Sequence, residues 1–554
     1  MTAVTSFVCG TTEQPLLFQT VGEVLKLAAE RSPKHDALIV RHQGTRLSYG
    51  ELNIHVDRLA RGLLACGLKP GDRVGIWSPN NSQWVITLFA AARAGLILVN
   101  INPAYRVTEL EYALVKVGCR MLILAPSFKS SNYLEMIRSL GEERRDCNTL
   151  SQLEFLVQLG EQAVPGFMSF DELCSRDTEL TGDEYEAMTS RLDADHPVSI
   201  QFTSGTTGQP KGATLTHFNI VNNGYFVGEA MKLGPDDRLC IPVPLYHCFG
   251  TVLGVLAAVT HGSTIVFPGE SFDAEAVLDS ITAERCTALH GVPTMFIAEL
   301  DHPRFRSFDL SSLRTGIMAG APCPTEVMRR VVDEMHMREI TICYGMTETS
   351  PVSFQSHVND PLERRMTTVG RVHPHVQVKI VDPEGKVVPR GASGELLTRG
   401  YSVMRGYWGD PERTAEAIDE AGWMHTGDLA ELDQDGYCRI VGRVKDMIIR
   451  GGENVYPREI EDFLYRHPKI LDVAVVGVTD AKYGEEVCAV IRLREGESAS
   501  REEIIAFCRG QIAHYKIPRY VHFVDDFPMT VTGKVQKFII RGQIERALDL
   551  QSAK

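Results

Sequence analysis

The sequence predicts an α/β protein with a large N-terminal domain and a smaller, mobile α+β C-terminal domain. The larger domain is expected to hold two doubly wound α/β subdomains and a small β-barrel-like subdomain. Three observations predict this class. The 554-residue chain exceeds the roughly 250–300 residues at which single cores stop growing. Short apolar runs typical of strands alternate with helical periodicity in the first part of the chain. After Gly370 the sequence changes to short strands joined by turns, and from Lys445 a further unit with its own strands and helices begins.

The first part of the chain predicts parallel sheets built from βα units. Val21–Arg31 and Tyr49–Cys66 carry helical periodicity, while Arg73–Trp77 and Met121–Ala125 are short apolar runs typical of buried strands. The same alternation predicts four more strands, at Val198–Phe202, Ser263–Phe267, Ala288–Val292 and Thr341–Cys343. The stretch from Gly141 to Glu186 has the least regular pattern, and we expect it at the surface.

The later part of the chain predicts two smaller units. Val376–Val381, Glu395–Thr398 and Tyr437–Val441 are short strands joined by Gly, Pro and Asp turns, which indicates the barrel-like piece. From Lys445 we expect a separate domain, which divides the chain into residues 1–444 and 445–554. Its expected strands and helices are Val473–Val478, Val487–Leu493, a helix after Pro457 and a helix after Ser500.

Composition narrows the possible partners and compartments. The net charge of −14 disfavours nucleic acid, which requires a basic face, but leaves a small anionic ligand possible. Thirteen cysteines without a CxxC pair argue against a disulfide or zinc framework and for a reducing compartment. We find no apolar stretch long enough to span a membrane and no signal peptide. We therefore expect a cytoplasmic protein; a mature form in the mitochondrial matrix would have the same features.

A segment rich in glycine and hydroxyl groups follows the strand Val198–Phe202. Glycines bring backbone N–H groups close to an anion, hydroxyls add donors and a lysine adds charge, so the segment suits a phosphate group. It differs from the common P-loop because Pro210 precedes its lysine. A plain surface turn is the alternative. The residues are Thr203, Ser204, Gly205, Thr206, Thr207, Gly208 and Lys211.

Three further motifs fit a nucleotide site, and each has a structural alternative. Tyr344–Thr349 supplies an aromatic ring, hydroxyls and the carboxylate of Glu348, although a strand-to-helix turn capped by Thr347 would look alike. Asp428, fifteen residues before Arg443, could accept ribose hydroxyls or lie in a plain turn. Lys534, on a Thr-Gly-Lys turn, could be a mobile catalytic cation or a solvated lysine.

Taken together and in this order, the motifs resemble the ANL superfamily of adenylate-forming enzymes over essentially the whole chain. Within it, the resemblance is to acyl-CoA synthetases, above all medium-chain enzymes of the family member 2 type. Three further segments contribute: Pro244–Gly250, Ala319–Pro322 and Arg450–Pro457. The resemblance implies a fatty or carboxylic acid–CoA ligase of lipid metabolism that forms acyl-AMP with ATP and Mg²⁺, releases pyrophosphate and transfers the acyl group to coenzyme A.

The resemblance also implies roles for individual residues. Lys534, His247, Glu348 and Thr203 would be catalytic, and Thr203 and Glu348 would reach Mg²⁺. Tyr344 would lie against the adenine, and Asp428 would take the ribose hydroxyls near Arg443. The remaining expected nucleotide and coenzyme A contacts are Ser204, Gly205, Thr206, Thr207, Gly208, Lys211, Gly320, Ala321, Pro322, Gly345, Met346, Thr347, Lys445, Gly451, Gly452 and Glu453.

Lys445 matches the family's hinge, about which the C-terminal domain would rotate between the half-reactions, exchanging Lys534 for Gly451-Gly452. The acyl pocket would be lined by His247, Cys248, Phe249, Val292, Met318, Ala319 and Gly320. Cys248 stands where relatives that activate α-amino acids carry Asp, so an amino acid substrate is disfavoured. Phe249 and Met318 are bulky and could shorten the pocket, so short- and medium-chain acids both remain open.

Four other functions remain to be weighed. An aryl acid could replace the alkyl acid, or the acyl group could be loaded onto a carrier protein, although no carrier domain with a phosphopantetheine site follows Lys534. A sensor that had lost the chemistry should lack Lys534 or Glu348, and both are present. A dinucleotide dehydrogenase is disfavoured because no G-x-G-x-x-G motif follows the early strands. A homodimer is an open possibility.

Overall fold

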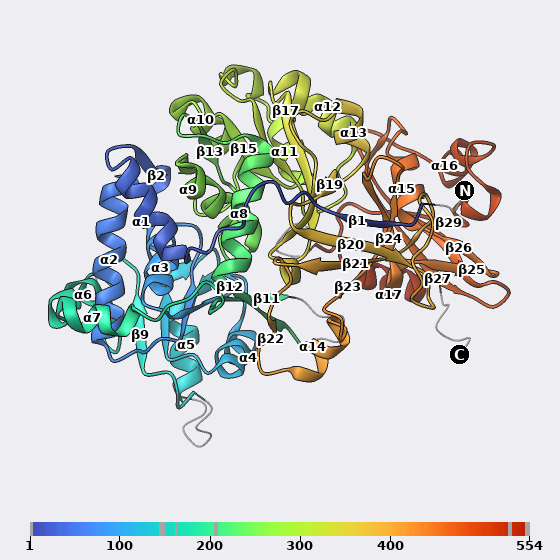
Figure 1. Ribbon diagram of the computed structural model, residues 1–554. Helices are drawn as coiled ribbons and strands as arrows, with labels where there is room; N and C mark the ends of the chain where they lie inside the picture. Colours follow the sequence, from blue (N-terminus) through green and yellow to red (C-terminus); the bar gives the residue numbers. More distant parts are fainter. Residues whose placement is uncertain (1–3, 143–149, 161–162, 204–208, 530–534, 549–554) are drawn as a thin grey trace.

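A computed structural model describes residues 4–142, 150–160, 163–203, 209–529 and 535–548. Two large mixed sheets and a smaller one form the first four-fifths of the chain, and a fourth sheet follows (Figure 1). The α/β prediction is confirmed. Within the described ranges, no helix is long and apolar enough to cross a membrane.

The first large sheet carries the strand that leads into the glycine-rich segment. Its order is β10-β9-β6-β4-β5-β11-β12-β22; neighbours from β10 to β11 are parallel, and β12 and β22 add antiparallel at one edge. The bounds are β10 Met168–Ser169, β9 Phe155–Gln158, β6 Met121–Leu124, β4 Arg73–Trp77, β5 Ile97–Asn100, β11 Pro197–Thr203, β12 Lys211–Thr216 and β22 Gly406–Tyr407.

The second large sheet has six parallel strands in its centre and antiparallel strands at both edges. Its order is β19-β18-β17-β16-β15-β13-β14-β2-β3. The bounds are β19 Arg371–Val372, β18 Val352–Gln355, β17 Glu339–Gly345, β16 Thr315–Met318, β15 Ala288–Gly291, β13 Arg238–Cys240, β14 Thr264–Phe267, β2 Asp36–Val40 and β3 Thr45–Ser48.

Helices between and around these sheets share one large apolar core. Capping boxes start three of them, where the sequence has Thr20 with Glu23, Ser48 with Glu51 and Thr216 with Asn219. The helices of this core are α1 Val21–Arg31, α2 Tyr49–Ala65, α3 Ser82–Arg93, α6 Phe170–Ser175, α8 His217–Met231, α9 Ala257–His261 and the π-helix η3 Phe249–Leu256. The others flanking the sheets are α4 Val107–Val117, α5 Tyr133–Glu142, α7 Gly182–Thr189, α10 Ala274–Glu284, α11 Pro293–Leu300, α12 Thr325–Glu334 and α13 Leu362–Thr367.

The third sheet corrects the barrel prediction. It is open and antiparallel, in the order β1-β20-β21-β23-β24, and does not close on itself. Its first strand comes from the start of the chain and lies beside β20 (Figure 1), a long-range pairing that short local patterns do not indicate. The bounds are β1 Phe7–Cys9, β20 Val376–Val381, β21 Gly394–Gly400, β23 Met424–Leu432 and β24 Cys438–Arg443, with α14 Pro411–Ala417 packed near β22.

The last part of the chain has its own sheet and core. β27 and β28 form a long antiparallel pair, with the hairpin β25–β26 at one side and β29 parallel to β28. The elements are β25 Ile448–Arg450, β26 Glu453–Val455, α15 Pro457–Leu464, β27 Ile470–Asp480, β28 Gly484–Leu493, α16 Arg501–Cys508, β29 Tyr520–Phe523 and α17 Lys537–Ala547. Helices follow Pro457 and Ser500, as predicted.

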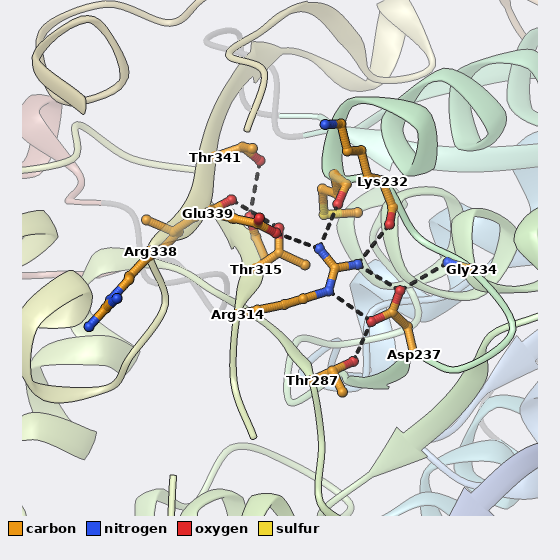
Figure 2. A network of polar contacts seen from close by, with 12 residues as sticks. Lys232, Gly234, Asp237, Thr287, Arg314, Thr315, Arg338, Glu339 and Thr341 are labelled. Carbon is orange, nitrogen blue, oxygen red and sulfur yellow. Dashed lines mark hydrogen bonds and ion pairs between the residues drawn. The ribbon is translucent and has the colours of Figure 1, made fainter. Parts of the chain in front are cut away.

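One arginine links the elements that meet at the amino-terminal ends of the parallel strands in the nine-stranded sheet (Figure 2). This side of the sheet is called its amino-terminal edge. Arg314, just before β16, donates two hydrogen bonds to Asp237, at 3.1 and 2.7 Å, and one to Glu339 at 2.6 Å. It also donates to the carbonyls of Met231 and Lys232, where α8 ends. A bidentate charge-assisted pair of this kind is stronger than a neutral hydrogen bond, so this network holds α8 and three strand starts together.

Candidate functional site

The carboxyl edges of the two large sheets bring the predicted nucleotide motifs together. In α/β sheets, ligands bind outside the carboxyl ends of the strands. Thr203 ends β11, Gly320 follows β16, and Tyr344 and Gly345 end β17. Gly345 has no room for a side chain, because a Cβ there would lie 1.7 Å from the carbonyl oxygen of Pro351. Chain packing therefore requires glycine at the turn that carries Met346 and Thr347.

Thr203 and Glu348 meet although 145 residues separate them. The Thr203 hydroxyl donates to Glu348 Oε1 at 3.4 Å, and Glu348 is buried in the short helix η5 Thr347–Thr349. Two neighbouring oxygen groups of this kind suit Mg²⁺, which prefers oxygen ligands and is commonly held by one or two carboxylates plus substrate phosphates. Within the described ranges, no group of three or more His, Cys, Asp or Glu could hold a metal ion. One carboxylate and one hydroxyl fit a Mg²⁺ ion that takes its other ligands from phosphate and water.

Lys211 is linked to the same carboxylate through Tyr407, a residue that the sequence motifs did not predict. Its Nζ donates to the hydroxyl of Tyr407 at 2.9 Å, and that hydroxyl donates to Glu348 Oε1 at 2.8 Å. Burial lowers the pKa of Lys211, and the nearby Glu348 carboxylate opposes this shift. In the sequence, Tyr407 stands between Gly406 and Trp408, and this short segment has no characteristic spacing from the predicted site residues. The sequence alone therefore did not indicate a role for Tyr407.

Both carboxylate oxygens of Asp428 accept hydrogen bonds. Its Oδ2 accepts a hydrogen bond from the Tyr344 hydroxyl at 2.6 Å, and its Oδ1 accepts one from Arg443 Nε at 3.2 Å. The second contact follows from strand pairing, because Asp428 lies opposite Arg443 in the β23–β24 ladder. Burial and the Asp428 carboxylate raise the pKa of Tyr344 well above its usual value, so its hydroxyl stays a donor. The structure thus joins two sequence motifs into one arrangement.

The loop after β16 borders the site. Gly320 has φ +87° and is exposed, Ala321 is half-buried and Pro322 is exposed. The neighbouring Cys323 is buried, which raises its pKa to about 12, and Arg458 of α15 opposes this shift. Gly320 and Pro322 thus lie at the surface after β16, beside a buried cysteine.

His247, Cys248 and Phe249 enter the π-helix beside the Glu348 motif. The Cys248 sulfur lies 3.7 Å from His247 Nδ1 and 3.9 Å from the Thr347 hydroxyl. The backbone N–H of Phe249 donates to His247 Nδ1 at 3.1 Å. π-helical turns occur frequently at functional sites, and this one brings the predicted acyl residues next to the predicted nucleotide residues.

Most of the predicted acyl-pocket residues share one cluster, but Met318 does not. Cys248, Phe249, Val292 and Ala319 belong to the large core, whereas Met318 is fully buried among the residues that pack around Phe296. Met318 is the last residue of β16, and Ala319 follows it outside the strand. Met318 therefore lies in a different buried cluster from Phe249, and its part in an acyl pocket stays a prediction.

The remaining predicted residues lie in or near the last unit. Lys445 lies in the exposed 3₁₀ turn η6 Val444–Asp446. Gly451 (φ +61°) and Gly452 (φ +89°) form the two-residue turn of the β25–β26 hairpin, where glycine is favoured because both dihedrals are positive. Glu453 is exposed at the start of β26. Six predicted residues lie outside the described residues: Ser204, Gly205, Thr206, Thr207, Gly208 and Lys534.

Comparisons with known proteins agree with this arrangement. The AMP-binding enzyme family matches residues 25–408, and the AMP-binding enzyme C-terminal domain matches residues 459–534. The chain belongs to the AMP-binding enzyme family, the adenylate-forming ligases that include the acyl-CoA synthetases.

Two curated relatives and two solved structures illustrate the likeness. The mitochondrial medium-chain acyl-CoA ligase ACSF2 of Danio rerio is 47% identical, over 99% of this chain and 92% of its own. The putative acyl-CoA synthetase YngI of Bacillus subtilis (strain 168) is also 47% identical, over 97% and 99%.

The anthranilate CoA ligase AuaEII, solved with anthranoyl-AMP, is 27% identical with a TM-score of 0.87, covering 97% of this chain and 99% of its own. ATP-bound MatB from Rhodopseudomonas palustris is 29% identical with a TM-score of 0.82, covering 95% and 99%. Both agree with the observed architecture over nearly the whole chain, and the acid–CoA ligase class predicted from the motifs is confirmed.

Proposed function

We propose that this protein is an ATP- and Mg²⁺-dependent acyl-CoA synthetase that activates a short- to medium-chain carboxylic acid. The products would be acyl-CoA, AMP and pyrophosphate. The observation that carries the proposal is the meeting of Lys211, Glu348 and Thr203 on one side of the site with Tyr344 and Asp428 on the other. These groups suit the phosphates and the ribose of one nucleotide.

The physical problem is that the acid and the nucleotide are both anions. Lys211 would neutralise the outer phosphates, and Thr203 and Glu348 would hold Mg²⁺, which supplies charge neutralisation when bound. Asp428 would accept the ribose hydroxyls, in an orientation maintained by Tyr344 and Arg443. Such preorganised charges lower the barrier because they need no reorganisation during reaction. Lys534, carried over from the motif, would stabilise charge between the carboxylate and the α-phosphate.

The apolar surroundings of the predicted acyl residues support an alkyl acid. Cys248 and Phe249 are nearly fully buried, and Val292 and Ala319 add small apolar surface. A site with such a lining favours an uncharged chain over a charged one. The name of the Danio rerio relative, a medium-chain acyl-CoA ligase, agrees with this choice. An aryl acid is the second candidate, favoured by the high structural similarity to an anthranilate CoA ligase.

The experiment is a panel of acids with the purified protein. We expect acyl-CoA, AMP and pyrophosphate in equal amounts, with the highest kcat/KM on alkyl acids of short or medium length. Removal of Mg²⁺ with a chelator should abolish turnover, and re-addition should restore it. A preference for benzoate-type acids over every alkyl acid would replace the first candidate with the second, and ADP as product would contradict both.

We also propose that Lys445 is the hinge between residues 1–444 and 445–554. It lies between the two matched family segments, in an exposed turn directly before β25. Lys445→Pro would fix φ at this residue, so we expect it to impair one half-reaction more than the other. Equal loss in acyl-AMP formation and in transfer to coenzyme A would count against a rotation there.

A further inference from the structure

We propose that Tyr407 is a positioning residue that holds the Lys211 ammonium and the Glu348 carboxylate in a fixed relation. The inference rests on the proposed function, because it assigns these two groups to the phosphates and to Mg²⁺. Tyr407 belongs to none of the motifs that identify the site. Its role would be to present both charges already oriented, before the nucleotide arrives.

The Tyr407 hydroxyl is the centre of a four-residue chain of hydrogen bonds. It accepts from Lys211 Nζ at 2.9 Å and donates to Glu348 Oε1 at 2.8 Å. The same Glu348 oxygen accepts from the Thr203 hydroxyl at 3.4 Å. Lys211 Nζ also lies 4.3 Å from the centre of the Tyr407 ring. One hydroxyl therefore couples the predicted phosphate cation to both predicted metal ligands.

The direction of these bonds is fixed by charge. An ionised carboxylate only accepts hydrogen bonds, so the Tyr407 hydroxyl is the donor to Glu348. Lys211 has no acceptor capacity, so it donates to the hydroxyl oxygen. Hydrogen bonds to charged partners are stronger than neutral ones. The arrangement thus restrains two side chains that would otherwise have several rotamers.

The backbone around Tyr407 is anchored on both sides of the site. Tyr407 pairs with Ala213 across the β12–β22 ladder, two residues after Lys211. The N–H of Trp408 donates to the carbonyl of Gly212 at 2.8 Å, and the N–H of Met404 donates to the carbonyl of Glu348 at 2.9 Å. The Tyr407 N–H donates to the Thr414 hydroxyl of α14 at 2.9 Å. This anchoring gives the hydroxyl a defined place between the strand of Lys211 and the turn of Glu348.

The test compares Tyr407→Phe with the matched control Tyr437→Phe. Tyr437 is likewise buried, and its hydroxyl likewise donates to a carboxylate, that of Asp360 at 2.7 Å, which belongs to no proposed ligand site. ATP binding is measured by calorimetry over a Mg²⁺ series, without acid or coenzyme A. We expect the Mg²⁺ midpoint to rise about tenfold in Tyr407→Phe, the loss of one charge-assisted hydrogen bond. Tyr437→Phe should stay within about twofold.

A double-mutant cycle separates positioning from general destabilisation. If Tyr407 acts through Glu348, Tyr407→Phe should raise the midpoint far less in a Glu348→Gln background, because the carboxylate it orients is gone. Equal penalties in both backgrounds, or an unchanged midpoint in Tyr407→Phe, would overturn the inference while leaving the proposed function intact. Absence of Mg²⁺-dependent ATP binding in the unmodified protein would overturn both. Thermal unfolding of each variant verifies that it is folded.

Discussion

The two edges of the nine-stranded sheet differ in how their polar groups are used. At the amino-terminal edge, Arg314 is surrounded by Asp237, Glu339 and two carbonyls at the end of α8 (Figure 2). At the carboxyl edge, Gly320 and Pro322 are exposed, and Tyr344 holds a carboxylate proposed to take a ribose. The charges at one edge pair within the protein itself, and those at the other are proposed to bind a ligand.

A strong ion-pair network therefore does not by itself mark a functional site. Both edges contain short charge-assisted hydrogen bonds. What distinguishes the carboxyl edge is that three separate motifs, from β11, β17 and β23, converge there beside exposed glycine turns. Substitutions at the amino edge should therefore change stability, and substitutions at the carboxyl edge should change the reaction.

Arg314→Ala is expected to have the largest effect. It leaves the nearly buried Asp237 carboxylate without its bidentate partner, which should cost about 3 kcal/mol of unfolding free energy, less than a fully buried pair because the Arg314 side chain is 32% exposed. Denaturant unfolding measures the loss. The control is Arg338→Ala on the same edge, whose exposed side chain points away from the network (Figure 2). A changed KM for ATP in folded Arg314→Ala, with stability preserved, would reverse the comparison.

Lys534→Ala changes a residue of the last unit of the chain that is proposed to act at the carboxyl edge. Removing a charge-stabilising group should slow acyl-AMP formation by roughly 10²-fold or more and spare transfer to coenzyme A from preformed acyl-AMP. Pyrophosphate release and single-step transfer are measured separately. The control is Lys469→Ala, which removes a partly exposed ion pair with Glu503 in the same unit. Unchanged pyrophosphate release would remove Lys534 from the mechanism.

Asp428→Ala should raise the KM for ATP about tenfold, because it removes a charged acceptor and leaves the Tyr344 hydroxyl without its partner. Stability should change less than in Arg314→Ala. Glu431→Ala, which breaks a pair with Arg439 in the same β23–β24 ladder, is the matched control. If both variants raise KM alike, the ladder, and not the ribose acceptor, is responsible.

Phe249→Leu should have the smallest effect, on preference and not on rate. A smaller side chain in an apolar pocket leaves room for a longer acid. One methylene group in such a pocket changes kcat/KM by about 10-fold at the lower end of the usual range, and we expect a change of this size in favour of the longer acid. The ratio of kcat/KM for two acids that differ by two carbons measures it. Met318→Leu is the control, because Met318 lies in the other core cluster. A shift in Met318→Leu alone would show that the acyl chain follows a different path.

The sequence predicted local elements better than distant partners. Val21–Arg31 and Arg73–Trp77 match α1 and β4, because their periodicity and caps are local. The strand predicted at Thr341–Cys343 extends to Glu339–Gly345, since pairing with β18 continues beyond the apolar run. The barrel prediction failed because closure depends on which strands pair, and β1 enters from the far end of the chain.

The site shows the same division. Asp428 and Arg443 were both predicted as site residues, fifteen residues apart in the sequence. That they contact each other follows from the register of β23 and β24, which the sequence did not show. Tyr407 was missed because its importance comes from where β22 joins the sheet. Met318 and Ala319 are adjacent in sequence but lie in different buried clusters, which depends on tertiary packing that the motifs do not show.

The most direct test of the central claim is acid-dependent exchange of labelled pyrophosphate into ATP, measured with Mg²⁺ and without coenzyme A. We expect exchange with a short- or medium-chain alkyl acid, accumulation of acyl-AMP, and loss of both in Lys534→Ala. Absence of exchange with every alkyl and aryl acid, while the folded protein binds ATP, would contradict the claim.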